Sequence, residues 1–301
     1  MTTTLISTPA STLASTRTQE PEISQPSVSS TVSRAAVQST STISLSPAAA
    51  SPNGTPLHGT TSAADDFLDW RKIVFVRLSH RFDHAATKDL MTWAVETFGD
   101  GLSIGTSFGA SGIALMDLTL KIHPDVDIFY IDTGYFFPET LQLMKRLERH
   151  YQRNFRRVST QLSIQEQEKR YGPRLFQSDP DLCCHVRKVL PMTAALTDST
   201  AWATAVRRDQ APSRRNTPLV QWNERHNVVK IAPLAHWAES DVWDYIHKHN
   251  LPYNRLHDQN YPSIGCWPCT RAVQPGEDLR AGRWADVEKI ECGIHVDAVR
   301  A

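Results

Sequence analysis

Hydrophobic and polar residues recur with two different periods from Asp83 onward, and the two periods alternate along the chain. Apolar residues at helical spacing predict helices over residues 84–98, 110–122, 138–152, 183–196 and 239–249. Short apolar runs typical of buried strands lie at residues 102–106, 126–131, 155–158, 202–206 and 228–231. This alternation predicts an α/β fold with a Rossmann-like, doubly wound, mostly parallel sheet covered by helices on both faces.

Small and hydroxyl-bearing residues follow two of the predicted strands, at the point where each strand gives way to a helix. The candidate residues are Thr106, Ser107 and Gly109 in the first loop and Asp132, Thr133 and Gly134 in the second. Each loop alone is also typical of an ordinary turn, and neither matches a lysine-bearing phosphate loop or a GxGxxG fingerprint. Because ligands bind at the carboxyl ends of parallel strands, the two loops together favour a nucleotide site.

The first sixty residues differ in composition from the rest of the chain. They contain 25 Ser and Thr, no aromatic residue and four charged residues, which leaves too little apolar surface to offset the entropy of ordering. We expect residues 1–60 to be a disordered extension, with an organelle-import signal or a partner-binding segment as alternatives. The remaining chain is predicted to form an α/β domain over residues 61–275 and a mobile C-terminal segment over residues 276–301.

The chain of 301 residues is electrically neutral, with 32 Lys and Arg against 32 Asp and Glu. General binders of nucleic acid or acidic membranes carry a basic surplus, so this balance argues against both partners. No uncharged apolar run approaches the roughly 20 residues of a membrane-spanning helix. We expect a cytoplasmic protein, or an imported one if the extension is a transit peptide.

Four of the five cysteines form two close pairs. Cys183 and Cys184 are adjacent, and their Cα separation of about 3.8 Å is below the usual disulfide range of about 4.4–6.8 Å. Cys266 and Cys269 form a CxxC in a Gly- and Pro-rich turn, which suits two thiolates on one metal. Together the pairs predict a four-thiolate site for zinc or an iron–sulfur cluster. Packed thiols or a redox dithiol are the alternatives.

The remaining cysteine, Cys292, is typical of a nucleophile that attacks a substrate and then presents the adduct to a protein reductant. An incidental surface thiol is the alternative. The adjacent Glu291 opposes formation of a thiolate, so we expect nearby cations to stabilise it, namely Arg280, Arg283, Lys289 and His295. Three sets of basic residues around the cysteines predict a pocket for a sulfate or phosphate group; they are Arg187 with Lys188, Arg207 with Arg208, and Arg280 with Arg283.

Several segments of the sequence resemble the assimilatory adenylyl-sulfate reductases of iron–sulfur type, within the APS/PAPS reductase family. The matching segments are residues 183–188, 207–210, 257–271, 276–278, 280–284 and 291–295. The resemblance runs in register from about Ala85 to Val296, and the combination of segments is highly specific.

The resemblance implies a fold of the adenine-nucleotide α-hydrolase (PP-loop ATPase-like) type and reduction of adenylyl sulfate (APS) to sulfite and AMP. It implies a [4Fe–4S] cluster on Cys183, Cys184, Cys266 and Cys269. It also implies an S-sulfocysteine intermediate on Cys292, reduced by thioredoxin or a similar dithiol protein. A homo-oligomer is compatible with these implications. The implied substrate contacts are Thr106, Ser107, Gly109, Asp132, Thr133, Gly134, Lys188, Arg207, Arg280, Arg283 and His295.

Two departures from the family pattern concern the nucleotide. Relatives usually carry Glu-Asp where this chain has Ser111 and Gly112, and a glycine where it has Ala205, whose Cβ would crowd the adenosine. Three other functions are weighed against APS reduction. The first is reduction of the 3′-phosphorylated nucleotide, PAPS. The second is adenylyl transfer or ATP pyrophosphatase chemistry, which would need carboxylates for Mg²⁺. The third is a nucleotide- or metal-sensing module.

Overall fold

The computed structural model describes residues 73–285 and 287–295. The predicted extension over residues 1–60 lies outside the described residues. The part of the predicted C-terminal segment after His295 lies outside them as well. No helix in the described part of the chain combines the length and apolar character that crossing a membrane requires.

A six-stranded sheet forms the centre of the fold, in the order β3-β2-β1-β4-β6-β5. Every neighbouring pair is parallel except the edge pair of β5 and β6. The prediction of a doubly wound, mostly parallel sheet is therefore confirmed. The strands are β1 (Leu102–Thr106), β2 (Asp127–Asp132), β3 (Arg156–Ser159), β4 (Ala201–Ala203), β5 (Val220–Asn223) and β6 (Val228–Ile231).

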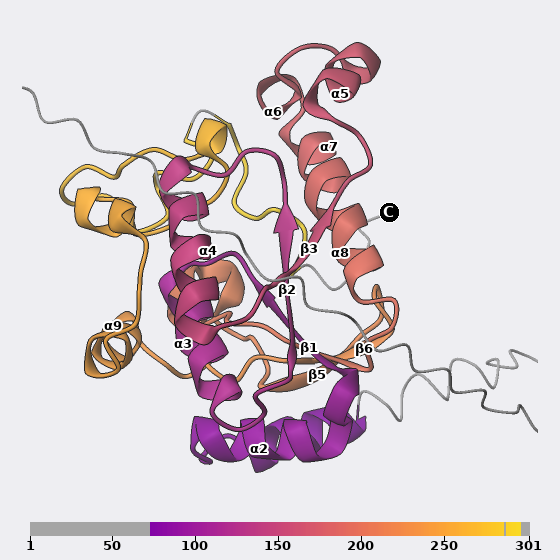
Figure 1. The fold of residues 1–301 in the computed structure, drawn as a ribbon, viewed down its shortest axis with the longest axis vertical. Helices are drawn as coiled ribbons and strands as arrows, with labels where there is room; N and C mark the ends of the chain where they lie inside the picture. The colour runs from indigo at the N-terminus through magenta and orange to yellow at the C-terminus, as the bar shows by residue number, and fades with distance from the viewer. Residues whose placement is uncertain (1–72, 286, 296–301) are drawn as a thin grey trace, which may run out of the picture. The chain divides into compact units, whose positions relative to one another are not determined.

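Helices cover both faces of this sheet, as Figure 1 shows: α3, α4 and α9 lie on one side and α7 and α8 on the other. Residues 73–81 are also helical. The helices are α2 (Thr87–Phe98), α3 (Ala110–Leu120), α4 (Pro138–Tyr151), α5 (Ile164–Tyr171), α6 (Leu175–Ser178), α7 (Pro180–Cys184), α8 (Leu190–Ala195) and α9 (Glu239–Lys248).

Each face of the sheet has its own apolar cluster. The larger cluster contains Ile104, Ile113 and Leu115, all fully buried, and joins the sheet to α2, α3, α4 and α9. The smaller one packs Met192 of α8 against Phe129 and Trp202 on the opposite face. Burial on both faces explains why β2 contains a continuous apolar run over residues 128–131 rather than an alternating pattern.

A buried carboxylate also connects the three helices of the larger face. Asp117 of α3 accepts hydrogen bonds from the hydroxyl of Tyr151 in α4, at 3.2 Å, and from that of Tyr245 in α9, at 2.7 Å. Lys121 forms an ion pair with the same carboxylate at 2.6 Å. Burial and the negative charge of Asp117 raise the pKa of both tyrosines.

The helix predicted over residues 183–196 is interrupted by a π-helical turn. It consists of α7, the π-helical residues His185–Val189, and α8. The turn changes the register of the side chains, so that both Arg187 and Lys188 are buried together with Cys183 and Cys184. Such π-helical insertions are frequent at functional sites.

Candidate active site

A cavity of about 280 Å³ opens where the loops after β1, β2 and β4 meet the segment that carries Cys292. β1 and β4 are neighbours in the centre of the sheet, although they connect to helices on opposite faces. This is the topological switch point at which α/β sheets bind ligands. The structure brings most of the predicted site residues to the wall of this cavity: Thr106, Ser107, Gly109, Thr133, Lys188, Arg207, Cys266, Arg280, Arg283, Cys292 and His295.

The first predicted loop turns tightly above β1. Its backbone at Phe108 has a φ of 59°, and the Phe108 amide donates to Thr106 Oγ1 at 3.1 Å, while the phenyl ring is buried in the core. A Cβ at Gly112 would lie 2.8 Å from the same Thr106 oxygen. This close approach favours a glycine at position 112. The neighbouring Ser111 accepts a hydrogen bond from Arg207.

The residues of the second predicted loop have two different roles, one at the cavity and one in the turn itself. Thr133 lines the cavity, but Asp132 and Gly134 do not. The carboxylate of Asp132 forms an ion pair with Arg157 at 2.7 Å and accepts the Gly134 amide at 2.9 Å, so it stabilises the turn. The Thr133 carbonyl accepts from Arg187 at 2.9 Å. This loop is therefore joined to the cysteine-bearing helix as well as to the cavity.

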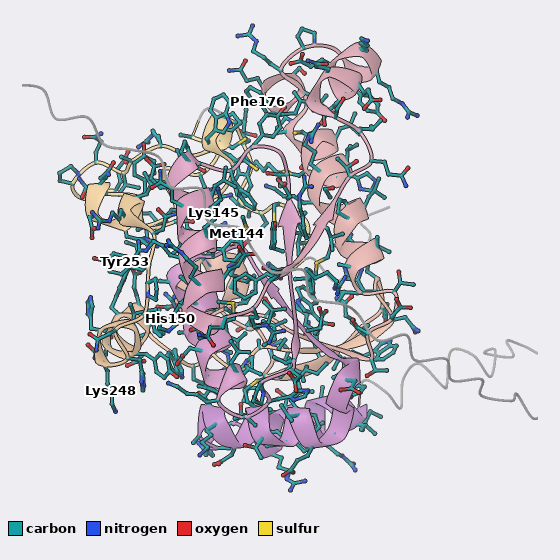
Figure 2. All side chains as sticks on the ribbon, in the orientation of Figure 1. Met144, Lys145, His150, Phe176, Lys248 and Tyr253 are labelled. Atoms are coloured by element: carbon teal, nitrogen blue, oxygen red, sulfur yellow. The ribbon has the colours of Figure 1, made fainter. Side chains whose placement is uncertain are left out.

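The four paired cysteines line a second, smaller cavity. Its aromatic rim includes Phe176 of α6, labelled in Figure 2, whose ring lies 5.6 Å from that of Tyr135 and 6.3 Å from that of Trp267. Within residues 73–285 and 287–295, no three His, Cys, Asp or Glu side chains are close enough together to ligate a single metal ion. All five cysteines are free thiols.

Burial and neighbouring thiols disfavour the thiolate form at this smaller cavity. They raise the pKa of Cys183 to about 12 and that of Cys269 to about 11. Lys188 acts in the opposite direction on both groups. Four soft sulfur donors with a buried cation beside them are a donor set suited to an iron–sulfur cluster.

Lys188 and Cys266 line both cavities, so the cysteine site and the larger cavity share a wall. The Lys188 ammonium is buried and donates to Cys184 Sγ at 3.7 Å. Burial opposes its charge, but Cys266, Cys292 and Cys184 outweigh that effect and raise the pKa of Lys188. The shared wall therefore carries the buried ammonium group of Lys188.

The residues that follow Cys292 pack against the sheet and the loop before β6. The His295 ring stacks on Trp202 of β4, with ring centres 5.5 Å apart and planes 8° apart. Lys230 of β6 donates to the His295 carbonyl at 3.2 Å, and Arg225 donates to the Gly293 carbonyl at 2.7 Å. Burial and the surrounding cations hold the pKa of His295 well below its ordinary value, so the ring is neutral.

The predicted arginines Arg280 and Arg283 approach the cavity from the N-terminal part of the predicted segment over residues 276–301. Arg283 donates to Ser263 Oγ at 3.4 Å, and its guanidinium lies 4.4 Å from the centre of the Trp284 ring. Lys188 and Lys289 lie 5.7 and 5.8 Å from the same ring. Trp284 thus holds three cations beside the cysteine site through cation–π contacts.

Sequence reasoning missed Arg214 and Trp284 as parts of this site. Arg214 lines the cavity and forms an ion pair with Glu291 at 2.7 Å. The expectation that Glu291 opposes a thiolate at Cys292 omitted this partner, whose charge compensates the carboxylate. The two residues are 77 positions apart in the chain, and no local pattern signals a contact over that distance.

Comparison with known proteins agrees with this arrangement. Residues 101–272 match the family model described as the phosphoadenosine phosphosulfate reductase domain. The chain is 44% identical over 209 residues to the adenosine 5′-phosphosulfate reductase of Staphylococcus haemolyticus, covering 69% of this chain and 86% of that relative. It is 45% identical over 208 residues to the enzyme of the same name from Halalkalibacterium halodurans, covering 69% and 90%.

A solved structure shares the fold. It is the phosphoadenylyl-sulfate reductase of Candida auris in a phosphate complex, with a TM-score of 0.58 and 30% sequence identity. The match covers 71% of this chain and all of that one. On the family model, the curated relatives and the shared fold, the chain belongs to the adenosine 5′-phosphosulfate reductases of the phosphoadenosine phosphosulfate reductase domain family.

Proposed function

We propose that this chain reduces APS to sulfite and AMP through a covalent intermediate on Cys292. The observation that carries the proposal is the placement of Cys292 on the same cavity as the Thr106 loop and the cations Lys188, Arg280 and Arg283. A thiol, a nucleotide loop and three cations at one cavity are the groups that sulfur transfer from a nucleotide requires. The names of the curated relatives support the same reaction.

In the first step, the Cys292 thiolate attacks the sulfur atom of APS. A sulfur–sulfur bond forms, the bond between that sulfur and the phosphate oxygen breaks, and AMP leaves with the electron pair. Negative charge increases on the departing phosphate, so fixed cations lower the barrier. We assign this work to Lys188, Arg280 and Arg283, with Thr106, Ser107, Gly109, Thr133 and Arg207 contacting the nucleotide.

In the second step, a dithiol protein such as thioredoxin releases sulfite. One of its thiolates attacks Cys292 Sγ, sulfite leaves with the bonding pair, and the second thiol then resolves the mixed disulfide. The dithiol is oxidised by two electrons, and the sulfur of the substrate is reduced by two. This step requires Cys292 to become accessible, so we propose that residues 276–301 move as a segment relative to the domain over residues 61–275.

We propose that Cys183, Cys184, Cys266 and Cys269 hold a [4Fe–4S] cluster. The support is the donor set: four thiols on one small cavity, with Lys188 on the wall shared with the larger cavity. Such a cluster takes one thiolate per iron and so does not need all four sulfurs on a single ion. When bound, it supplies a fixed charge that orients Lys188. Anaerobic iron and sulfide analysis distinguishes this cluster from zinc.

APS is the proposed substrate in preference to PAPS. The curated relatives at 44% and 45% identity are named for APS, whereas the solved reductase at 30% identity is named for PAPS. Sulfite release measured side by side should be faster with APS, and faster turnover of PAPS would reverse the assignment. Pyrophosphate release from ATP would instead favour the alternative chemistry on this fold.

The decisive experiment uses the reduced protein and sulfur-labelled APS without any reductant. We expect stoichiometric AMP release and an adduct of one SO₃ group on the peptide that contains Cys292. The Cys292→Ser variant should form no adduct. A labelled peptide elsewhere, or turnover by the serine variant, would contradict the proposal. Free thiols at all five cysteines are compatible with the reducing cytoplasm, which we propose as the compartment.

A further inference from the structure

The segment that carries Cys292 is held by an ion pair of Glu291, the residue directly before the thiol. Arg214 Nε donates to Glu291 Oε1 and Arg214 Nη2 donates to Oε2, both at 2.7 Å. Ser213 Oγ adds a third donor to Oε1 at 3.1 Å. The two charged side chains are only 13% and 14% exposed. This bidentate and partly buried geometry is the strong form of an arginine–carboxylate pair.

Arg280 approaches the same carboxylate from the other side. Its Nη2 lies 3.6 Å from Glu291 Oε2 and donates to the Ile290 carbonyl at 3.1 Å. Burial opposes ionisation of Glu291, but the hydrogen bond and charge of Arg214, together with the charge of Arg280, hold its pKa below the ordinary value. Glu291 is therefore ionised at neutral pH and faces two cations.

Arg214 is also anchored to the loop that follows β4. Its third guanidinium nitrogen, Nη1, donates to Gln210 Oε1 at 2.6 Å, and that oxygen also accepts the backbone amide of Arg207 at 3.1 Å. Each guanidinium nitrogen of Arg214 thus has a protein acceptor, which separates it from the cations proposed to contact substrate. Arg214 instead connects the loop at the cavity to the segment that carries the thiol.

We propose that Glu291 is a positioning residue that docks Cys292 at the cavity by pairing with Arg214. The inference rests on the proposed function of Cys292 and goes beyond it by assigning what holds the thiol in place. Release of this pair gives the segment the freedom that reaction with an external dithiol requires. The Arg214–Glu291 pair therefore determines how the Cys292 segment is distributed between the position for sulfur transfer and the position for reduction.

The test measures the rate of Cys292 alkylation by iodoacetamide in the reduced protein without substrate, read at the Cys292 peptide. The variants are Glu291→Gln, Arg214→Gln and the double variant, with Glu277→Gln as the matched control. Glu277 pairs with Arg271 at 2.8 Å on the exposed surface. Removing Glu291 favours the thiolate by local charge, whereas removing Arg214 disfavours it. The two single variants therefore have opposite electrostatic effects on the thiol.

Docking predicts the same direction for both single variants. Each should accelerate alkylation by about tenfold, the scale of a charged hydrogen bond, and the double variant should match the singles because one interaction is lost. Glu277→Gln should behave as wild type. Opposite directions in the two singles would reveal a charge effect without docking. That pattern, or unchanged rates in either single, would overturn the inference.

Steady-state kinetics with APS supply a second readout. Loss of docking should lower kcat about tenfold with little change in KM, because Lys188, Arg207 and the Thr106 loop lie outside the moving segment and still contact the nucleotide. A raised KM for Arg214→Gln alone would instead make Arg214 a substrate contact and overturn the inference. If the wild type fails to form the Cys292 adduct, the proposed function fails, yet the alkylation rates still decide whether Glu291 docks the segment.

Discussion

The ammonium group of Lys188, in the π-helical turn, lies 3.7 Å from the Sγ of Cys184 at the end of α7, and both residues are buried. Lys188 also lines the cavity that holds Cys292. One cation therefore contacts the cysteine site and faces the cavity that Cys292 lines. A lysine suits this place because its ammonium is a compact point charge on a flexible stem.

Replacing Lys188 with methionine should preserve the volume of the side chain and remove its charge. We expect kcat/KM for APS to fall by about 10- to 100-fold, the range that loss of a charged hydrogen bond implies. Lys145→Met is the matched control, since Lys145 is exposed on α4 (Figure 2). Iron content measured on the same samples separates a catalytic loss from a loss of the proposed cluster. Wild-type kinetics with a full complement of iron would contradict the role assigned to Lys188.

Arg283 should contribute directly to nucleotide binding. In a Cys292→Ser background, which prevents turnover, Arg283→Ala should weaken APS binding by about 1–3 kcal/mol, measured by titration calorimetry. Arg271→Ala, which removes a surface partner of Glu277, should leave the affinity close to that of the parent. An unchanged affinity for Arg283→Ala would place this guanidinium outside the binding site.

Gly265 offers a test of the same arginine without altering it. A Cβ at position 265 would lie 2.3–2.9 Å from the guanidinium atoms of Arg283. Because these atoms are the end of a flexible side chain, Gly265→Ala should fold normally and displace Arg283. We expect weaker APS binding by calorimetry and an unfolding midpoint within a few degrees of wild type. Normal affinity would show that Arg283 can bind from another position.

The buried carboxylate network predicts an alkaline dependence of stability. Tyr151 and Tyr245 have pKa values raised above 10 in the folded state, so the stability they contribute is complete below pH 10 and is lost as the pH rises above it. At pH 11 the loss should be about 1 kcal/mol per tyrosine. Urea unfolding at pH 8 and pH 11 should show a smaller decrease in Tyr151→Phe/Tyr245→Phe than in wild type. An equal decrease in both proteins would exclude these tyrosines as the cause.

Strongly periodic elements were the ones that sequence patterns predicted well. β1 and β6 have the predicted bounds, and α3, α4 and α9 differ from them by one or two residues at their C-terminal ends. Several elements were missed, among them α6 and the helical residues 73–81, and two others, α5 and β5, lack a clear apolar periodicity. α5 has Gln167 as its single buried residue, although its capping box of Ser163 and Glu166 was a usable signal. β5 is a short antiparallel edge strand of mixed polarity.

For the site as well, residues within contiguous motifs could be predicted, whereas contacts between distant segments could not. Thr106, Lys188 and Arg283 were identified from motifs that are contiguous in sequence, and they line the cavity. Asp132 belongs to such a motif too, but its carboxylate is directed to Arg157. That pairing, like the pairing of Arg214 with Glu291, depends on elements brought together by the sheet. Patterns within one segment contain no information about such partners.

The pairing of β1 with β4 has a consequence for how this protein acquires activity. Ile104 is in register with Ala203, across nearly one hundred intervening residues, and the loops that follow these two strands both line the cavity. Neither half of the chain alone contains both loops, so we expect nucleotide affinity to arise only after the long-range β1–β4 pair has formed. A bound nucleotide bridges the two halves and should raise the energetic cost of separating them. Ligand-dependent resistance to proteolysis would therefore report on assembly of the sheet itself.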